Sequence, residues 1–333
     1  MPAFLTHCLF SDDVLEKIED DELKKEILQR KAVYYLGAQG PDIFFFYRSR
    51  PWQKNDGIDQ LALRMHDSRT GDFFIESADY LKNYLKAGRR YYTVMTYMIG
   101  YICHYCLDKN THPLIHYQSG IDTLKNKTTR KYHNFHKRYE ALLDTYMLKK
   151  KRNLDAYRFK TYELVVLESR FIETLKSFYF YIINRVYKFD IKEIQVETAI
   201  RDTYLVLRSL HDPAGIKSAV YKIIENMLDK KDEITSLIYP RTAVDYGDFL
   251  NLTRKQWAHP CDEKLRFNYS LEELYNLALD EAVDLSEKFK GFITGKYGKS
   301  EIISKFNSSY STGLACDTNR DLRFFNSVFE PQE

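Results

Sequence analysis

Apolar and aromatic residues recur with helical spacing along most of the chain, and no region shows the alternation typical of a strand-rich protein. Stretches of this kind, each long enough for a helix, lie at residues 11–30, 73–87, 91–111, 132–148, 161–187, 191–210, 213–228 and 271–289. Turn residues such as Gly and Pro stand between several of them. The pattern therefore predicts an all-α fold built from many helices.

Local signals place some of the helix ends. Ser11 is a plausible N-cap for the first helix because acidic residues follow it, which leaves His7 just ahead of the helix. Pro113 disfavours helical geometry at the preceding residue, so we expect the helix over 91–111 to end there. His112 would then stand at its C-terminal end.

The segment 91–107 contains no Lys, Arg, Asp or Glu, but its 17 residues fall just short of a membrane span. We interpret it as a core helix. Residues 1–10 lack a basic start and a long apolar run, so no secretory signal is expected and the predicted location is the cytoplasm. Five cysteines, an odd number, argue against a disulfide framework.

Composition narrows the class of protein only slightly. Apolar residues make up 44% and charged residues 29%, the balance of a folded soluble protein. The formal net charge of +3 is too small to indicate a nucleic-acid partner or an anionic membrane by itself.

The first candidate functional residues lie in the segment 100–117, GYICHYCLDKNTHPLIHY. Here His104, Asp108 and His112 follow one another at intervals of four. On a helix this spacing places all three side chains on one face. Imidazole and carboxylate are zinc ligands, and the rise from His104 to His112 is roughly 12 Å, so a metal site here would hold more than one ion. Taken alone, the stripe fits a metal cluster and a hydrogen-bonded polar core equally well.

Other histidines favour the metal cluster. Seven of the nine histidines lie within the first 136 residues, and four of them stand near a carboxylate at ligand spacing. His136 and Glu140 are one helical turn apart. Asp42 follows a Gly-Pro turn, and His66 lies on a short apolar stretch. A chance cluster of this kind is less expected than a metal site.

In order, these residues read His, Asp, His, His-x-x-x-Asp, His, His-x-x-x-Glu, and residues 1–150 resemble the zinc-dependent phospholipase C family. The resemblance extends to the N-terminal domain of the phospholipase D that cleaves glycosylphosphatidylinositol anchors and, more distantly, to zinc-dependent single-strand nucleases. It implies an all-helical bundle around a cluster of two to three zinc ions.

The resemblance also assigns candidate ligands by position. It implies a first ion held by Asp42, His66, His104 and Asp108, a second by His112, His136 and Glu140, and a third by His7, with Asp108 bridging. The family's third ion also binds the first residue of the mature chain. That residue here would be Pro2 after removal of Met1, although family members are typically exported and this chain shows no signal.

Two residues, His112 and His116, are candidates for the same ligand position at the second ion. Bacterial members place a histidine six residues after the aspartate, where this chain has Leu114. The anchor-cleaving enzyme has the spacing of His112, which we prefer to His116 for the second ion. His116 and His133 would then support the ligands or face the substrate.

The implied activity is hydrolysis of a phosphodiester by in-line attack of a zinc-activated water, with Asp42 as the proton acceptor. The expected substrate is a phospholipid, with peripheral membrane contact through a loop that contains Trp52, and no stable nucleic-acid partner is expected. Alternatives are a zinc nuclease, a phosphomonoesterase, an HD-type phosphohydrolase suggested by His66 and Asp67, and an inactive metal-stabilised module that binds lipid or a partner.

The predicted organisation has three parts. Residues 1–154 form the metal-binding core, residues 155–295 add helices that pack on it within the same domain, and residues 296–333 form a polar, loosely held tail. His211 and His259 are predicted to lie in turns or at the surface.

Overall fold

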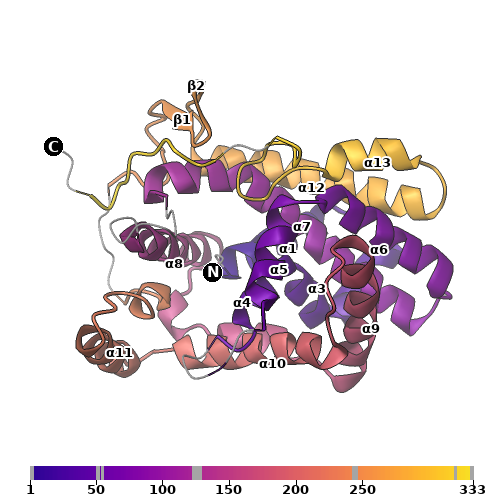
Figure 1. Cartoon of the computed structure of the whole chain (residues 1–333), viewed down its shortest axis with the longest axis horizontal. Coiled ribbons are helices and arrows are strands. Elements are labelled where there is room, and N and C mark those ends of the chain that lie inside the picture. Colours follow the sequence, from indigo (N-terminus) through magenta and orange to yellow (C-terminus); the bar gives the residue numbers. More distant parts are fainter. Residues whose placement is uncertain are drawn as a thin grey trace.

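The computed structural model describes residues 4–49, 53, 56–121, 130–241, 247–318 and 321–330. These residues form an all-helical protein with one small hairpin, which confirms the predicted fold class (Figure 1). The α-helices are α1 Phe4–Lys17, α2 Asp21–Gln29, α3 Lys31–Gly37, α4 Ile43–Phe46, α5 Ile58–Asp67, α6 Thr70–Tyr84, α7 Arg89–Ser119, α8 Arg130–Arg152, α9 Ser169–Val186, α10 Glu193–Leu210, α11 Ile216–Met227, α12 Leu271–Ile293 and α13 Lys299–Phe306. Short 3₁₀ turns are η1 Gly40–Asp42, η2 Ala156–Arg158, η3 Thr161–Val165 and η4 Thr235–Leu237, and strands β1 Trp257–His259 and β2 Asp262–Phe267 pair antiparallel.

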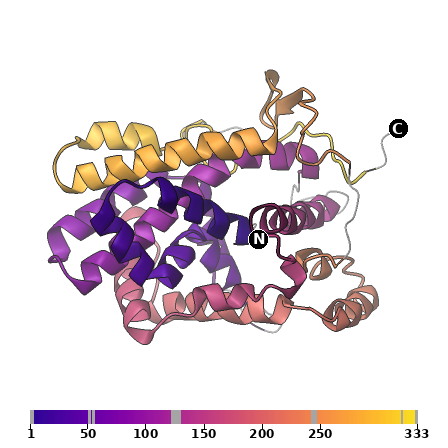
Figure 2. The same ribbon diagram turned by 180° about the vertical axis from the view of Figure 1, so that it is seen from behind.

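Helix α7 is the element on which the other helices pack. It has 31 residues, and α1, α3, α8, α9 and α12 all contact it. Most of its central turns are apolar and buried on every side, as expected of a helix inside a large core. Helices α12 and α10 lie along opposite sides of the molecule, as both views show (Figures 1 and 2).

Two glycines allow α3 and α7 to approach each other. A Cβ atom at Gly100 would lie 2.2 Å from the carbonyl oxygen of Tyr34, and one at Gly37 would lie 2.2 Å from that of Tyr97. Both distances are far below van der Waals contact, so any larger residue would push the two helices apart. The close approach brings the end of α3 against the part of α7 that carries His104.

The first helix does not begin where the sequence predicts. Helix α1 begins at Phe4, so Ser11 lies inside it and His7 is its fourth residue. Its N-terminal amides are capped from another helix, because the carboxylate of Asp144 on α8 accepts hydrogen bonds from the Leu5 and Thr6 nitrogens at 3.0 and 2.7 Å. A cap supplied by a residue so distant in sequence leaves no local signal. The predicted single helix over 11–30 is instead broken before Asp20, which caps α2.

The expected helix end at His112 is also wrong, because α7 continues through Pro113 to Ser119. Proline removes only one backbone donor, and the neighbouring elements α12, α8 and β1 pack along α7 and hold it in helical form. The carbonyl of Lys109, which a residue with an N–H at 113 would bond, lies against the backbone of Gly313. His112 and His116 therefore share one continuous helix.

The segment after Gly295 is packed, in contrast to the loose tail that we expected. Tyr310 is buried, and its nitrogen donates to the carbonyl of His66 at 2.9 Å. Farther along, the Asn326 nitrogen donates to Tyr117. The helix predicted over 161–187 is also different, since η3 precedes α9. The division at residues 154 and 295 stays a prediction.

No helix among the described residues is long and apolar enough to cross a membrane.

The contact between α3 and α7 can be tested with Gly100→Ala. We expect this variant to lower the free energy of unfolding by about 3 kcal/mol, because the added methyl group must displace backbone atoms. Urea denaturation would measure the change. Gly298→Ala is the matched control, since no heavy atom lies within 4 Å of the added Cβ, and it should change the free energy by less than about 1 kcal/mol. Equal stability of the two variants would contradict the packing argument.

Candidate metal centre

Residues far apart in the sequence meet in the interior where α7 passes α1, α5, η1 and α8. Two groups form there, and within each group one candidate donor atom from every residue lies within 4.8 Å of all the others. The first group contains Asp42, His66, His104 and Asp108, and the second contains His112, His136 and Glu140. The structure thus brings together the residues that the resemblance assigned to the first two ions.

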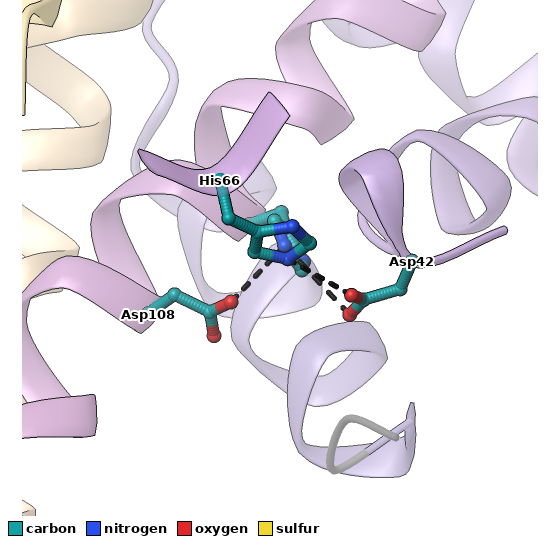
Figure 3. A group of neighbouring side chains, drawn as sticks. Asp42, His66 and Asp108 are labelled. Atoms are coloured by element: carbon teal, nitrogen blue, oxygen red, sulfur yellow. Dashed lines mark ion pairs between the residues drawn. The ribbon is translucent and has the colours of Figure 1, made fainter. Parts of the chain in front are cut away.

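In the first group, carboxylates approach the imidazoles from two sides. Asp42 Oδ1 lies 3.0 Å from His66 Nε2, and Asp42 Oδ2 lies 3.8 Å from His104 Nε2. From the other side, Asp108 Oδ2 lies 3.1 Å from His104 Nε2. In the view of Figure 3, Asp42 and Asp108 lie on opposite sides of His66. All four side chains are buried.

The second group consists of His112, one turn after Asp108 on α7, and His136 and Glu140 on α8. Glu140 Oε1 is 3.2 Å from His136 Nε2 and 3.8 Å from His112 Nε2. Glu140 is buried, whereas the two histidines are partly exposed. His112 also joins the groups, because its Nδ1 lies 3.6 Å from Asp108 Oδ2.

His7 approaches the same carboxylate from α1. Its Nε2 is 3.1 Å from Asp108 Oδ1, and its ring stacks on that of His104 with centroids 4.5 Å apart. Asp108 of the first group therefore contacts His7 and, through the 3.6 Å approach of His112, the second group as well.

Backbone carbonyls fix the orientation of the rings. The Nδ1 atoms of His66, His104 and His112 lie 2.8, 3.2 and 3.2 Å from the carbonyl oxygens of Ala62, Ala38 and Tyr310, respectively. A carbonyl only accepts, so each Nδ1 carries the hydrogen. A neutral ring in this tautomer presents the lone pair of Nε2, and this arrangement is typical of metal-bound histidine.

His104 gives the sharpest test of whether a metal fits. Among the described residues, its Nε2 and Asp108 Oδ2 are buried without a hydrogen-bond partner, although they lie only 3.1 Å apart. Burial lowers the pKa of His104 despite the nearby carboxylates, which favours the neutral ring. Two lone pairs then face each other, and a cation would relieve the repulsion. Ligands about 2.1 Å from a tetrahedral zinc ion are about 3.4 Å apart. The carboxylate–imidazole pairs in the two groups, at 3.0 to 3.8 Å, are close to this separation.

The pKa directions describe a tightly coupled set of charges. Burial opposes ionisation of Asp108, but His104, His112 and His7 outweigh it and hold the pKa of Asp108 well below its usual value. Burial also lowers the pKa of His112, but Asp108 and Glu140 overcome this effect and raise it to about 9. The lowered pKa keeps Asp108 ionised at neutral pH, so this residue supplies negative charge to the interior.

Two residues that support the site were missed from the sequence. Gly40 has a φ of +53°, and a Cβ there would lie 2.2 Å from His104 Cδ2, so only glycine leaves room for the ring. The Gly-Pro turn was a signal for this position. Tyr310 orients His112 through its carbonyl and packs on His66, with ring centroids 5.3 Å apart. Nothing in the sequence around Tyr310 indicated this role.

The remaining candidates lie outside the two groups. His116 stacks on His136 with centroids 4.9 Å apart, and burial followed by repulsion from His136 and His112 holds its pKa well below the usual value. His133 is exposed on α8. Asp67 is exposed and accepts a hydrogen bond from Ser309, so His66 and Asp67 do not form a shared site. Pro2 and Trp52 lie outside the described residues.

Histidines 211 and 259 lie away from both groups. His211 ends α10 and is partly exposed, as predicted. His259, in contrast, is buried in β1, where its Nε2 lies 2.9 Å from the carbonyl oxygen of Thr312.

The fold and the site together define a helical protein with buried histidine and carboxylate groups that are able to hold metal ions. Residues 6–189 match the family model of zinc-dependent phospholipase C. Because this match covers more than half of the chain, the protein belongs to the zinc-dependent phospholipase C family, as the resemblance implied. No curated protein and no solved structure showed a significant match. Family membership and the two groups support a zinc-dependent phosphoester hydrolase.

The charge coupling at His112 predicts how the metal-stripped protein responds to pH. The pKa of His112 is about 9 in the folded protein, above its usual value of 6.5. Its stabilising contribution is therefore complete below about pH 6.5 and is lost as the pH rises through about 9. We expect the free energy of unfolding of the metal-stripped protein to fall over this range, with about 3 kcal/mol due to His112.

Urea denaturation in the presence of a chelator, at several pH values, would measure this dependence. His112→Gln should flatten it, because glutamine does not titrate. An identical pH profile for the variant and the natural sequence would contradict the assigned coupling.

Proposed function

We propose that the protein is a phospholipase C that hydrolyses the phosphodiester bond of a phospholipid with the help of two to three zinc ions. The observation that carries the proposal is the pair of donor groups, one buried and one partly exposed, that are linked by the contact between Asp108 and His112. Family membership supports the same chemistry.

The candidate ligands can be assigned to three zinc ions. Asp42, His66, His104 and Asp108 would hold the first, and His112, His136 and Glu140 would hold the second. His7, which contacts Asp108, would hold a third together with the imino group of Pro2. Zinc bound there would lower the pKa of a coordinated water and neutralise charge on the phosphate.

The protein's own residues supply the rest of the mechanism. Asp42 is the proposed acceptor of the proton from the attacking water, since its carboxylate is buried beside two imidazoles and faces the centre. The carbonyls of Ala62, Ala38 and Tyr310 keep Nε2 of three histidines turned inward. Preorganisation of this kind lowers the cost of assembling the site during the reaction.

Asp108→Ala tests the proposal most directly. We expect the variant to retain less zinc and to hydrolyse phosphodiesters at least about a hundredfold more slowly, because the bridge between the groups is lost. Zinc content would be measured by plasma mass spectrometry. Hydrolysis would be measured with and without a chelator on monomeric short-chain phosphatidylcholine, single-stranded DNA and a nitrophenyl phosphate monoester.

Asp280→Ala is the matched control, since Asp280 forms only an exposed ion pair with Lys17. It should retain zinc and activity. Full zinc and turnover in Asp108→Ala would refute the assignment. Hydrolysis of DNA or the monoester alone would indicate a nuclease or a phosphomonoesterase, and bound zinc without any hydrolysis would indicate a binding module.

A further inference from the structure

Helix α11 has its polar side toward the protein, the reverse of an ordinary surface helix. Glu225 is its one buried residue, and its carboxylate accepts hydrogen bonds from the nitrogen and hydroxyl of Thr235 at 2.9 and 2.7 Å. Asp212 holds the other end, because it accepts from the Lys217 and Ser218 nitrogens at 3.1 and 2.8 Å. Polar contacts, rather than apolar packing, therefore attach α11 to the protein.

The outward side of α11 is apolar. Ile216, Val220, Ile223 and Met227 follow at steps of four, three and four, so they form one stripe on the side opposite Glu225. We name these four residues the outer stripe, and they are 67, 48, 60 and 81% exposed. A helix normally buries such a stripe. Figures 1 and 2 show α11 at an outer corner of the molecule.

Basic residues surround the outer stripe. Lys217, Lys222, Lys230 and Lys231 are all exposed on α11 or just after it. The acids nearby are Asp229 and Asp232, which are exposed, and Glu233, which forms an ion pair with Lys230. Long lysine side chains suit a surface whose phosphate groups lie just above an apolar layer. A second copy of this chain is a poorer partner, since a symmetric contact through the stripe would bring two sets of lysines together.

A cleft lies beside the start of α11, at Asp212, and reaches one residue of the candidate metal centre, Glu140. Its lining includes Glu140 and Phe4 together with His211, Asp212, Leu237 and Ile238, which lie before and after α11 in the sequence. A surface held against α11 would therefore lie next to an opening toward Glu140.

We propose that α11 is a membrane-docking helix that lies flat on a phospholipid surface. The outer stripe enters the boundary between head groups and acyl chains, and the lysines contact the lipid phosphates. Docking in this position presents the cleft to the lipid. Only the presentation of the cleft to the lipid rests on the proposed function. The docking itself is inferred from the exposed outer stripe and the lysines of α11. The helix also lies outside residues 6–189, so the family match does not include it.

The test compares the natural chain with Ile223→Asp/Met227→Asp and with Ile194→Asp. Ile194 lies on α10 and is 60% exposed, as is Ile223, so it controls for a new surface charge. Each protein would be sedimented with sucrose-loaded vesicles of phosphatidylcholine and phosphatidylserine. We expect the double variant to partition at least about tenfold less into vesicles, and the control to bind like the natural chain.

Hydrolysis assays with a monomeric and a vesicle substrate distinguish membrane docking from catalysis. Monomeric short-chain phosphatidylcholine should be cleaved equally by all three proteins, whereas vesicle lipid should be cleaved more slowly by the double variant alone. Vesicle binding that depends on the outer stripe, with no hydrolysis of either substrate, would support docking and contradict the phospholipase proposal. Docking is overturned if the natural chain does not sediment with the vesicles, or if the double variant and the Ile194→Asp control bind the vesicles equally. It is also overturned if sedimentation velocity shows that the natural chain is a dimer and the double variant is a monomer.

Discussion

The carboxylate of Asp108 is the interaction on which the rest of the structure depends. It is buried, and it contacts imidazoles from α1 and from both the preceding and the following turn of α7. Isolated burial of such a charge is costly, and two further carboxylates, Asp42 and Glu140, lie nearby. The interior of this helical protein is thus arranged around carboxylates that lie close together beside histidine rings.

Helix α8 links the parts of this arrangement. His136 and Glu140 approach the second group, while Asp144, one turn farther on, caps α1 and so places His7 beside Asp108. A movement of α8 would shift both ends of the centre together. Since Tyr239 also donates to Asp144 at 2.7 Å, the segment between α11 and the hairpin contributes to the same support. Residues beyond the family match therefore help to position residues within it.

The sequence predicted what depends on short-range periodicity and failed where distant segments meet. The spacing of His104, Asp108 and His112 correctly placed them on one helical face, and the order of the histidines correctly indicated the family. The start of α1 was missed because its cap comes from α8, and the continuation of α7 through Pro113 depends on packing from other helices. The roles of zinc ligand and proton acceptor stay predictions, as does the part of Pro2.

The contrast between α7 and α11 shows how the same residue types serve two purposes. Both helices are rich in apolar residues. Helix α7 is packed against seven other α-helices and needs no amphipathic pattern, whereas α11 contacts the protein through Glu225 and turns its apolar side to the solvent. Placing an acidic side chain inward and isoleucines outward forgoes hydrophobic stabilisation of about 1.5 to 3 kcal/mol for each large side chain. Such an arrangement is consistent with a helix whose apolar side is buried only on contact with a second phase, and a lipid surface is the phase in which a phospholipase would meet its substrate.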